Sequence, residues 1–254
     1  IRNRRHLRGH PWHRSLMNRI TGAVLAHSGL VDALHTTAGP MPYLVLPVPL
    51  EERFRPQASS QNWRQRLGIL EAAPVLGMVG KMAPGRGFDL LLETAAILEA
   101  DTHVVAVGHG EDRPMLEQLA SQLGVAQRVH WVGYQEEELP ALFATMDVVL
   151  FAAAGSDHGH RAVTEAQACA RPVVAAAIDG VGDLIVDRIS GRIVDRNAEA
   201  LAAAISDLLR DPDAARTMAG EASKLVSERR FETTGHQLAA FLHSIVDSYG
   251  ERLA

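Results

Sequence analysis

Short apolar runs alternate with segments of helical apolar spacing along the central part of the chain, from Pro74 onward. The predicted strands are residues 75–79, 103–107, 128–132, 147–151, 173–177 and 192–194. The predicted helices between them are residues 87–98, 114–123, 136–145 and 161–170. Strands that alternate with helices of this length are typical of an α/β fold with a doubly wound parallel sheet.

The two ends of the chain differ from this central pattern. After the sheet, helices are predicted over residues 198–209, 214–229 and 236–249, with Asp211-Pro212 as a break between the first two. Before it, a helix-like stretch to about residue 23 precedes a strand (24–26), a helix (29–34), a strand (43–48) and a proline-rich linker. The late helices could pack on the sheet or reach another domain, and the pattern leaves both open. We expect a partial second α/β domain with linker over residues 1–60, the main domain over 61–235, and a C-terminal helix over 236–254.

Composition narrows the class of protein. With 254 residues and 47% hydrophobic content, the chain can bury a sizeable core. Its net charge of -5 gives no general electrostatic reason to bind nucleic acid. The single cysteine, Cys169, excludes an intramolecular disulfide and is expected to be a buried, inert thiol. With no long apolar run and no signal peptide in the sequence, we expect a cytoplasmic protein, and the start at Ile1 suggests missing upstream sequence.

The loop after the first main strand combines glycines with positive charge. Residues 80–87 read Gly-Lys-Met-Ala-Pro-Gly-Arg-Gly. Gly80 lets the backbone approach a ligand, Gly87 begins a helix with free amides, and Lys81 and Arg86 add two cations. A diphosphate is the expected ligand, although a plain surface turn would also fit. The P-loop pattern is absent, because no Ser or Thr follows Gly-Lys.

Glycine turns also follow the next two strands. Gly108 and Gly110 flank a histidine after the second strand, and Gly133 with Tyr134 follows the third. The carboxyl ends of parallel strands lie at one edge of a sheet, where such sheets bind ligands. These turns therefore predict a cleft of nucleotide size at that edge.

The loop after strand 147–151 carries two carboxylates eight positions apart, Asp157 and Glu165. Both are expected at the same sheet edge, Glu165 in the first turn of its helix, where they can accept hydrogen bonds from ligand hydroxyls. The residues between them that are expected to contact the ligand are His158, Gly159, His160 and Arg161. One alternative is that Asp157 caps the helix and Glu165 is simply solvated. A metal site at the histidines is disfavoured, because no third ligand is apparent.

Taken in order, residues 80–92, 108–111, 128–133, 137–142 and 157–175 resemble the nucleotide-sugar-binding half of the family-4 retaining glycosyltransferases. The resemblance implies a Rossmann-like C-terminal half of a GT-B fold, a nucleoside diphosphate sugar as donor, and no metal or other cofactor. It implies that Lys81 and Arg86 hold the donor diphosphate, although the family has Arg first and Lys second. It also implies that Asp157, where the family has Glu, contacts the sugar and that Glu165 contacts the ribose.

The N-terminal residues extend this resemblance to the end of an acceptor domain. The similar segments are Arg4-Arg5-His6, Ala26-His27-Ser28, Leu46-Pro47 and Phe54. His6 matches a position that faces the reacting sugar in the family. The usual Pro-x-Gly-x-Asp segment is replaced by Pro47-Val48-Pro49-Leu50-Glu51. The first strands of an acceptor domain are not in this sequence.

The implied activity is transfer of a sugar, with retention, to a hydroxyl of a glycan or glycolipid in cell-envelope polysaccharide or lipopolysaccharide synthesis. The residues assigned to catalysis are Lys81, Arg86, Asp157 and His6. Those assigned to the donor are Gly80, Gly87, Gly108, Gly110, Gly133, Tyr134, His158, Gly159, His160, Arg161 and Glu165. The alternatives are a nucleotide-sugar epimerase or hydrolase, and a noncatalytic or truncated binding module. The arginines between Arg2 and Arg19 could contact anionic lipid headgroups as a peripheral membrane surface, or form a solvated face.

Overall fold

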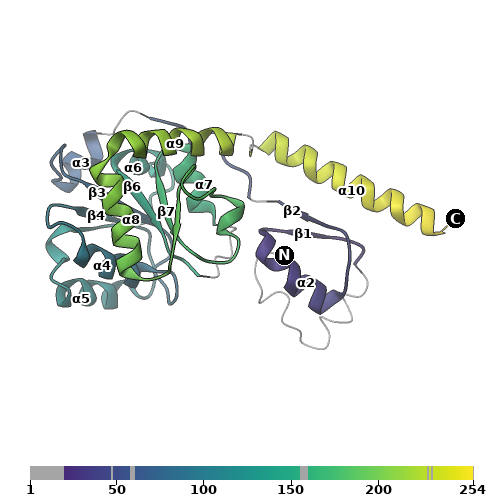
Figure 1. Cartoon of the computed structure of the whole chain (residues 1–254), viewed down its shortest axis with the longest axis horizontal. Helices are drawn as coiled ribbons and strands as arrows, with labels where there is room; N and C mark the ends of the chain where they lie inside the picture. The colour runs from purple at the N-terminus through teal and green to yellow at the C-terminus, as the bar shows by residue number, and fades with distance from the viewer. Residues whose placement is uncertain are drawn as a thin grey trace.

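The computed structural model describes residues 20–46, 48–57, 61–154, 160–227, 229 and 231–253. Its main body is built on a parallel sheet with the strand order β5-β4-β3-β6-β7-β8 (Figure 1). The strands are β3 (Val75–Val79), β4 (His103–Val107), β5 (Val129–Val132), β6 (Val148–Phe151), β7 (Val173–Ala176) and β8 (Arg192–Val194). The predicted α/β class and all six strand positions are confirmed to within one or two residues.

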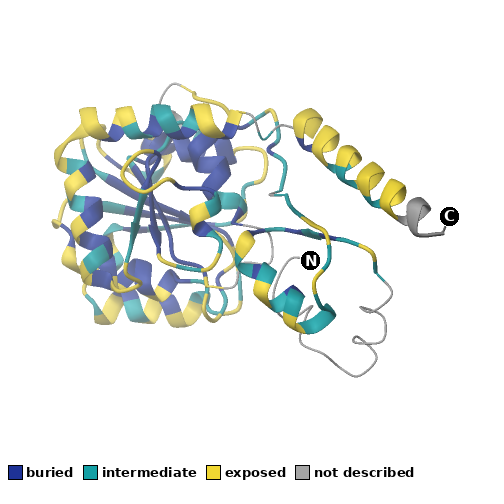
Figure 2. Cartoon of the chain, turned by 45° about the vertical axis from the view of Figure 1, so that its right-hand side comes forward, coloured by how far each residue is buried: buried dark blue, intermediate teal, exposed yellow. Residues whose placement is uncertain are grey.

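Helices cover both faces of this sheet, which is why its strands are apolar without alternation. One face packs against α4 (Phe88–Ile97), α5 (Arg113–Gln122) and α8 (Ala198–Arg210). The other packs against α3 (Gln61–Leu67), α6 (Leu139–Thr145) and α7 (Arg161–Ala168). Within β3, Leu76 and Met78 point to the first face and Val75 to the second, as the pleat of a strand requires. The buried residues accordingly concentrate in the sheet and the inner sides of these helices (Figure 2).

A second, smaller unit lies beside the main body (Figure 1). Its parallel strands β1 (Ala23–Leu25) and β2 (Tyr43–Val45) are joined through a 3-10 turn and α2 (Val31–Ala38). The buried apolar residues that form its core are Ala23, Leu25, Leu30 and Leu34. A core of this size fits a partial α/β domain. The strand predicted over 43–48 is shorter than expected, and the helix predicted over 29–34 continues to Ala38.

The three late helices divide between the two units. The helix α9 (Pro212–Ser227) packs against α7 and α8 on the main body. The helix α10 (Phe231–Leu253) leaves the main body and reaches the small unit, where a Cβ built on Gly22 would lie 2.8 Å from the Ile245 side chain. Most of α10 is otherwise exposed (Figure 2). The sequence left open whether the late helices pack on the sheet or reach another domain. The helix α9 packs on the main body, and α10 reaches the small unit.

One helix was missed from the sequence, and one predicted break is present. The helix α3, which was not predicted, follows the linker, and its residue Arg64 is buried, with Nη1 donating to the carbonyl of Ala73 at 2.8 Å and Nη2 to the Asp147 carboxylate at 3.0 Å. The break predicted at Asp211-Pro212 is confirmed, since α8 ends at Arg210 and α9 begins at Pro212. Pro212 is the first residue of α9, where its missing N–H costs nothing, and the Asp211 carboxylate accepts from the Ala214 N–H at 3.0 Å.

Candidate functional site

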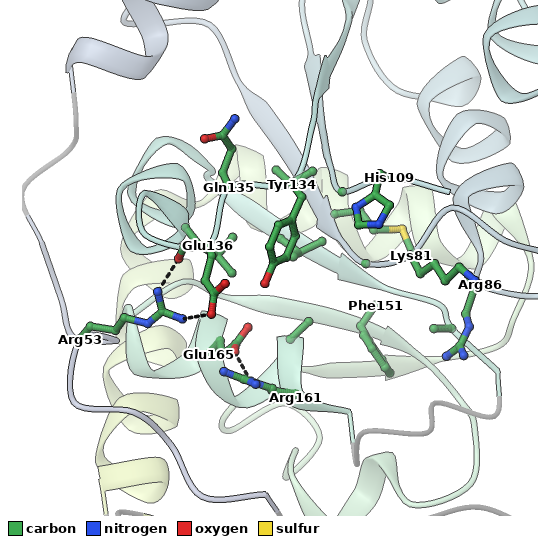
Figure 3. A pocket seen from close by; sticks show the side chains of 18 residues that line it. Arg53, Lys81, Arg86, His109, Tyr134, Gln135, Glu136, Phe151, Arg161 and Glu165 are labelled. Atoms are coloured by element: carbon green, nitrogen blue, oxygen red, sulfur yellow. Dashed lines mark hydrogen bonds and ion pairs between the residues drawn. The ribbon is translucent and has the colours of Figure 1, made fainter. Parts of the chain in front are cut away.

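A cavity of about 510 Å³ opens at the carboxyl ends of β3, β4 and β6 (Figure 3). The strands β3 and β6 are neighbours, and the crossover from β3 leads to β4 on one side whereas the crossover from β6 leads to β7 on the other, so the strand order reverses between them. Parallel sheets bind ligands at such a switch point. The volume lies within the range of small-molecule sites. The predicted cleft is therefore present at the predicted edge.

Two cations occupy one end of the cavity, which we call the cation end (Lys81 and Arg86; Figure 3). Lys81 Nζ lies 3.7 Å from the Glu111 carboxylate, and both side chains are more than half exposed. An exposed ion pair at this distance contributes little, so the ammonium group can turn to an anionic ligand at small cost.

The backbone at the cation end is built from two loops in contact. The Met82 N–H donates to the His109 carbonyl at 2.9 Å, and Gly108 has φ of 134°. A Cβ on Gly108 would lie 1.9 Å from the Gly80 carbonyl oxygen, and one on Gly110 would lie 1.9 Å from the Met82 carbonyl oxygen. Only glycine fits at either position. Of these glycines, Gly80 and Gly108 line the cavity itself.

Gly87 supports the same end from behind. It stands before α4 with φ of 83°, and a Cβ there would lie 2.7 Å from the Ala152 carbonyl oxygen at the end of β6. This close approach brings the start of α4 against β6. Gly87 has this packing role and is not among the residues that line the cavity, and its donor contact stays a prediction.

The opposite end, which we call the acid end, is formed around Glu165 (Figure 3). Glu165 is only 5% exposed, and its Oε1 accepts a hydrogen bond from Arg161 Nε at 2.5 Å. Burial raises the pKa of the Glu165 carboxyl to about 7, and the nearby Arg161 opposes that rise. The expectation of a first-turn position was wrong, since α7 begins at Arg161 and Glu165 lies one turn further on. The alternative of a simply solvated Glu165 is excluded by its burial.

Arg161 belongs to a series of alternating charges at the acid end, of which all but Glu51 line the cavity. Its Nη2 contacts the Glu51 carboxylate, and Glu51 Oε2 lies 2.8 Å from Arg53 Nε. Arg53 Nη1 donates in turn to the Glu136 carbonyl at 2.5 Å. We call this set the charge chain: Glu165, Arg161, Glu51, Arg53 and Glu136. The sequence pointed to Arg161 and Glu165 but not to the role of the other three, which lie far away along the chain. Glu51 stood out only as the last residue of the segment that replaces Pro-x-Gly-x-Asp.

The remaining predicted residues are distributed as follows. Tyr134 lines the cavity between its two ends, whereas Gly133 does not line it. His160 is buried outside the cavity lining, with its Nε2 2.7 Å from the Asp179 carbonyl and its ring stacked on His27 at 5.3 Å between centroids. The predicted residues that lie outside the described part of the chain are His6, Asp157, His158 and Gly159, together with the arginines between Arg2 and Arg19.

Two general features complete the description. Within the described ranges, no three His, Cys, Asp or Glu side chains are grouped so that they could hold a metal ion, and no helix is long and apolar enough to cross a bilayer. Cys169 is buried, which raises the pKa of its thiol to about 12. A thiol with that pKa is not a nucleophile at neutral pH, as the sequence predicted.

Comparison with known proteins adds to this geometry. Residues 59–225 match the family described as glycosyl transferases group 1. The chain is 33% identical over 208 residues to D-inositol 3-phosphate glycosyltransferase of Corynebacterium urealyticum, covering 76% of this chain and 49% of that protein. It is also 33% identical over 205 residues to GDP-mannose-dependent alpha-(1-6)-phosphatidylinositol monomannoside mannosyltransferase of Mycolicibacterium smegmatis, covering 75% and 53% respectively. The chain thus spans about half the length of the curated relatives it matches.

Solved structures show the same fold at lower identity. Alr3699/HepE of Anabaena in complex with UDP and glucose superposes with a TM-score of 0.84 at 24% identity, covering 95% of this chain and 67% of that one. WaaG, a glycosyltransferase involved in lipopolysaccharide biosynthesis, superposes with a TM-score of 0.74 at 22% identity, covering 85% and 61%. Both are similar in the main body and in the parts that flank it, since the shared region exceeds the main domain alone.

Proposed function

The chain belongs to the group 1 glycosyl transferases, and from that premise we propose that it carries the donor site of an enzyme that moves a sugar from a nucleoside diphosphate to a hydroxyl acceptor. One observation supports the proposal above others. Lys81 and Arg86 line one end of a single cavity and Glu165 lines the other, at the switch point of a parallel sheet. A diphosphate linked to a ribose offers two anionic groups and a pair of hydroxyls, which matches these two ends.

Catalysis rests, in this proposal, on stabilising the negative charge of the leaving diphosphate. When the bond between the sugar and the diphosphate breaks, negative charge grows on the diphosphate, and Lys81 and Arg86 stabilise that charge in the transition state. Gly80 and Gly108 let the ligand lie close to the backbone between the two cations and β4.

The other contacts are assigned by the position of each residue. Glu165 accepts hydrogen bonds from the ribose hydroxyls, and Tyr134 lies against the base. In line with the family-4 resemblance, Asp157 contacts the donor sugar, His6 lies on the acceptor side, and transfer proceeds with retention and without a metal. No nucleophilic side chain is assigned.

The acceptor is proposed to be a hydroxyl of a glycan or glycolipid of the cell envelope. The relatives named above act, by their names, on an inositol phosphate and on a phosphatidylinositol mannoside. Both are polyhydroxylated, and one is a lipid. Contact between the arginines from Arg2 to Arg19 and anionic headgroups would suit a lipid acceptor.

The test is a donor screen followed by product analysis. The chain is heated with UDP-, GDP- and ADP-sugars, and one of them is expected to raise the unfolding temperature, because a ligand that binds only the folded state stabilises it. The stabilising donor is then incubated with and without hydroxyl acceptors, and the anomeric proton of the product is followed by NMR. Donor consumption that needs an acceptor and gives the same anomer supports retaining transfer. Consumption without an acceptor indicates an epimerase or hydrolase, and stabilisation by none of the donors would overturn the proposal.

A further inference from the structure

The buried carboxylate of Glu165 lies in surroundings that disfavour its charge. A ribose hydroxyl donates most strongly to an ionised carboxylate, yet Glu165 is 5% exposed and its burial raises its pKa to about 7. The cation nearest to it is Arg161, whose Nε donates to Oε1 at 2.5 Å from one turn earlier on α7. The charged form of Glu165 at neutral pH therefore depends on Arg161.

Arg161 is itself held from outside α7. Its Nη2 contacts Glu51, which lies in the segment that connects the small unit to the main body. Burial lowers the pKa of Arg161, and the carboxylates of Glu165 and Glu51 outweigh that effect, so its pKa is raised overall. Figure 3 shows the Arg161 side chain directed along the cavity wall toward Glu165. Two carboxylates thus fix one guanidinium, one from the helix and one from the linker.

We infer that Arg161 is a positioning residue for the donor: it keeps the Glu165 carboxylate charged and directed into the cavity, while the linker holds Arg161 through Glu51. The inference rests on the proposed function, in which Glu165 is the ribose contact. It adds that the linker between the two units takes part in building the donor site.

Within the described residues, several charged and titratable groups surround Glu165. From α7 comes Arg161, and directly after α7 comes Cys169, which is a neutral thiol at ordinary pH because burial raises its pKa to about 12. From the linker they are Glu51, which raises the pKa of Glu165, and Arg53, which lowers it. From the loop between β5 and α6, Tyr134 and Glu136 line the same cavity. Among these groups Arg161 exerts the largest effect that favours the charged form.

The experiment compares three variants of the chain across pH. Arg161→Leu removes the cation, and Arg161→Lys restores charge without the planar fork. Arg113→Leu is the matched control, because Arg113 Nε pairs with Glu117 Oε1 at 2.9 Å with the same spacing on α5, and Arg113 is not among the residues that line the cavity. UDP-glucose and GDP-mannose are the probes, since their diphosphates are diesters and lack the proton that titrates near pH 6 in a phosphate monoester.

Binding is measured by calorimetry at pH 6, 7 and 9. Removing a neighbouring opposite charge shifts a carboxyl pKa by about one to three units. Arg161→Leu should therefore weaken binding about tenfold at pH 7 and leave it within about twofold of wild type at pH 9. Arg161→Lys should recover most of the loss, and Arg113→Leu should match wild type throughout. Equal weakening by Arg161→Leu at pH 6 and pH 9 would overturn the inference.

A second measurement separates the inference from the proposed function. The Glu165 side-chain carbon is titrated by NMR in protein labelled with carbon-13 glutamate, and its signal is identified by its loss in Glu165→Gln. The pKa should be higher in Arg161→Leu than in wild type by about one unit or more. An unchanged pKa would refute the role of Arg161. Failure of wild type to bind any nucleotide sugar would instead refute the proposed function, while the titration would still report on Arg161.

Discussion

The two ends of the cavity are built in opposite ways. At the cation end the backbone is rigid and the Lys81 side chain is only weakly held: the loops of Gly80 and Gly108 touch, while Lys81 is exposed and its ion pair with Glu111 spans 3.7 Å. At the acid end the side chains are rigid, because the buried Glu165 is fixed by Arg161 and through it by the linker. Substitution of Lys81 at the cation end should therefore change function with little change in stability. At the acid end, a substitution of Glu165 that raises stability should lower donor binding.

The largest expected effect tests the rigid backbone of the cation end. Gly108→Ala places a methyl group 1.9 Å from the Gly80 carbonyl oxygen at φ of 134°, where only backbone could move to relieve the clash. We expect a loss of more than about 4 kcal/mol in the free energy of unfolding, measured by urea denaturation. Gly85→Ala is the control in the facing loop between β3 and α4, because its φ of 74° strains alanine but no atom lies within 4 Å, and it should cost about 1 kcal/mol. Similar losses for the two variants would show that loop contact does not fix this end.

The next effect tests whether stability and donor binding conflict at the acid end. Burial raises the pKa of Glu165 to about 7 in the folded chain from its ordinary value of 4.5, so the fold favours its protonated form. The stability that this group contributes is complete below about pH 4.5 and is lost as pH rises through 7. Relative to wild type, Glu165→Gln should therefore become more stable by about 3 kcal/mol between pH 4.5 and pH 8, while it loses donor affinity. A stability difference that does not vary with pH would contradict the claim that burial of Glu165 disfavours its charged form.

The third effect tests whether the two cations of the cation end act in turnover rather than in stability. Lys81→Ala or Arg86→Ala should lower donor turnover about a hundredfold, which is the usual cost of removing one charge-stabilising group. Lys81→Ala should leave the free energy of unfolding within about 0.5 kcal/mol, since its ion pair is exposed. Lys224→Ala, which removes the exposed partner of Glu221, is the control and should change neither quantity. Unchanged turnover in both cation-end variants would refute the diphosphate assignment.

The contrast between the ends also explains what the sequence could predict. The cation end was found because glycines, cations and strand ends lie together in short segments, and local geometry follows from local sequence. Glu165 and Arg161 were found for the same reason, one turn apart on a helix. Glu51 and Arg53 were not, because they reach Arg161 and Glu136 across long stretches of chain, and no local pattern records which distant charges will meet.

The positions of His160 and α10 also depend on contacts between distant parts of the chain. His160 was expected to contact the donor because of its neighbours in the loop, but φ of 58° and a stacking partner from the small unit, His27, place it outside the cavity lining. The crossing of α10 to the small unit depends on Gly22 and Ile245, which lie at opposite ends of the chain. Apolar patterns predicted the helices and strands involved, but contacts between segments far apart in the sequence could be found only in the three-dimensional structure.

The smallest expected effect concerns the outer part of the charge chain. Arg53→Gln removes a partly exposed ion pair with Glu51, so the free energy of unfolding should fall by less than about 1 kcal/mol and donor affinity by about two- to threefold. Arg53 also lines the cavity, so it could act on the donor directly or through Glu51 and Arg161. A double-mutant cycle with Arg161→Leu distinguishes these routes, measured as binding of UDP-glucose or GDP-mannose at pH 7. If Arg53 acts through Arg161, Arg53→Gln has no further effect once Arg161 is leucine; an equal loss in both backgrounds would mean that the charge chain ends at Glu51 and that Arg53 contacts the donor on its own.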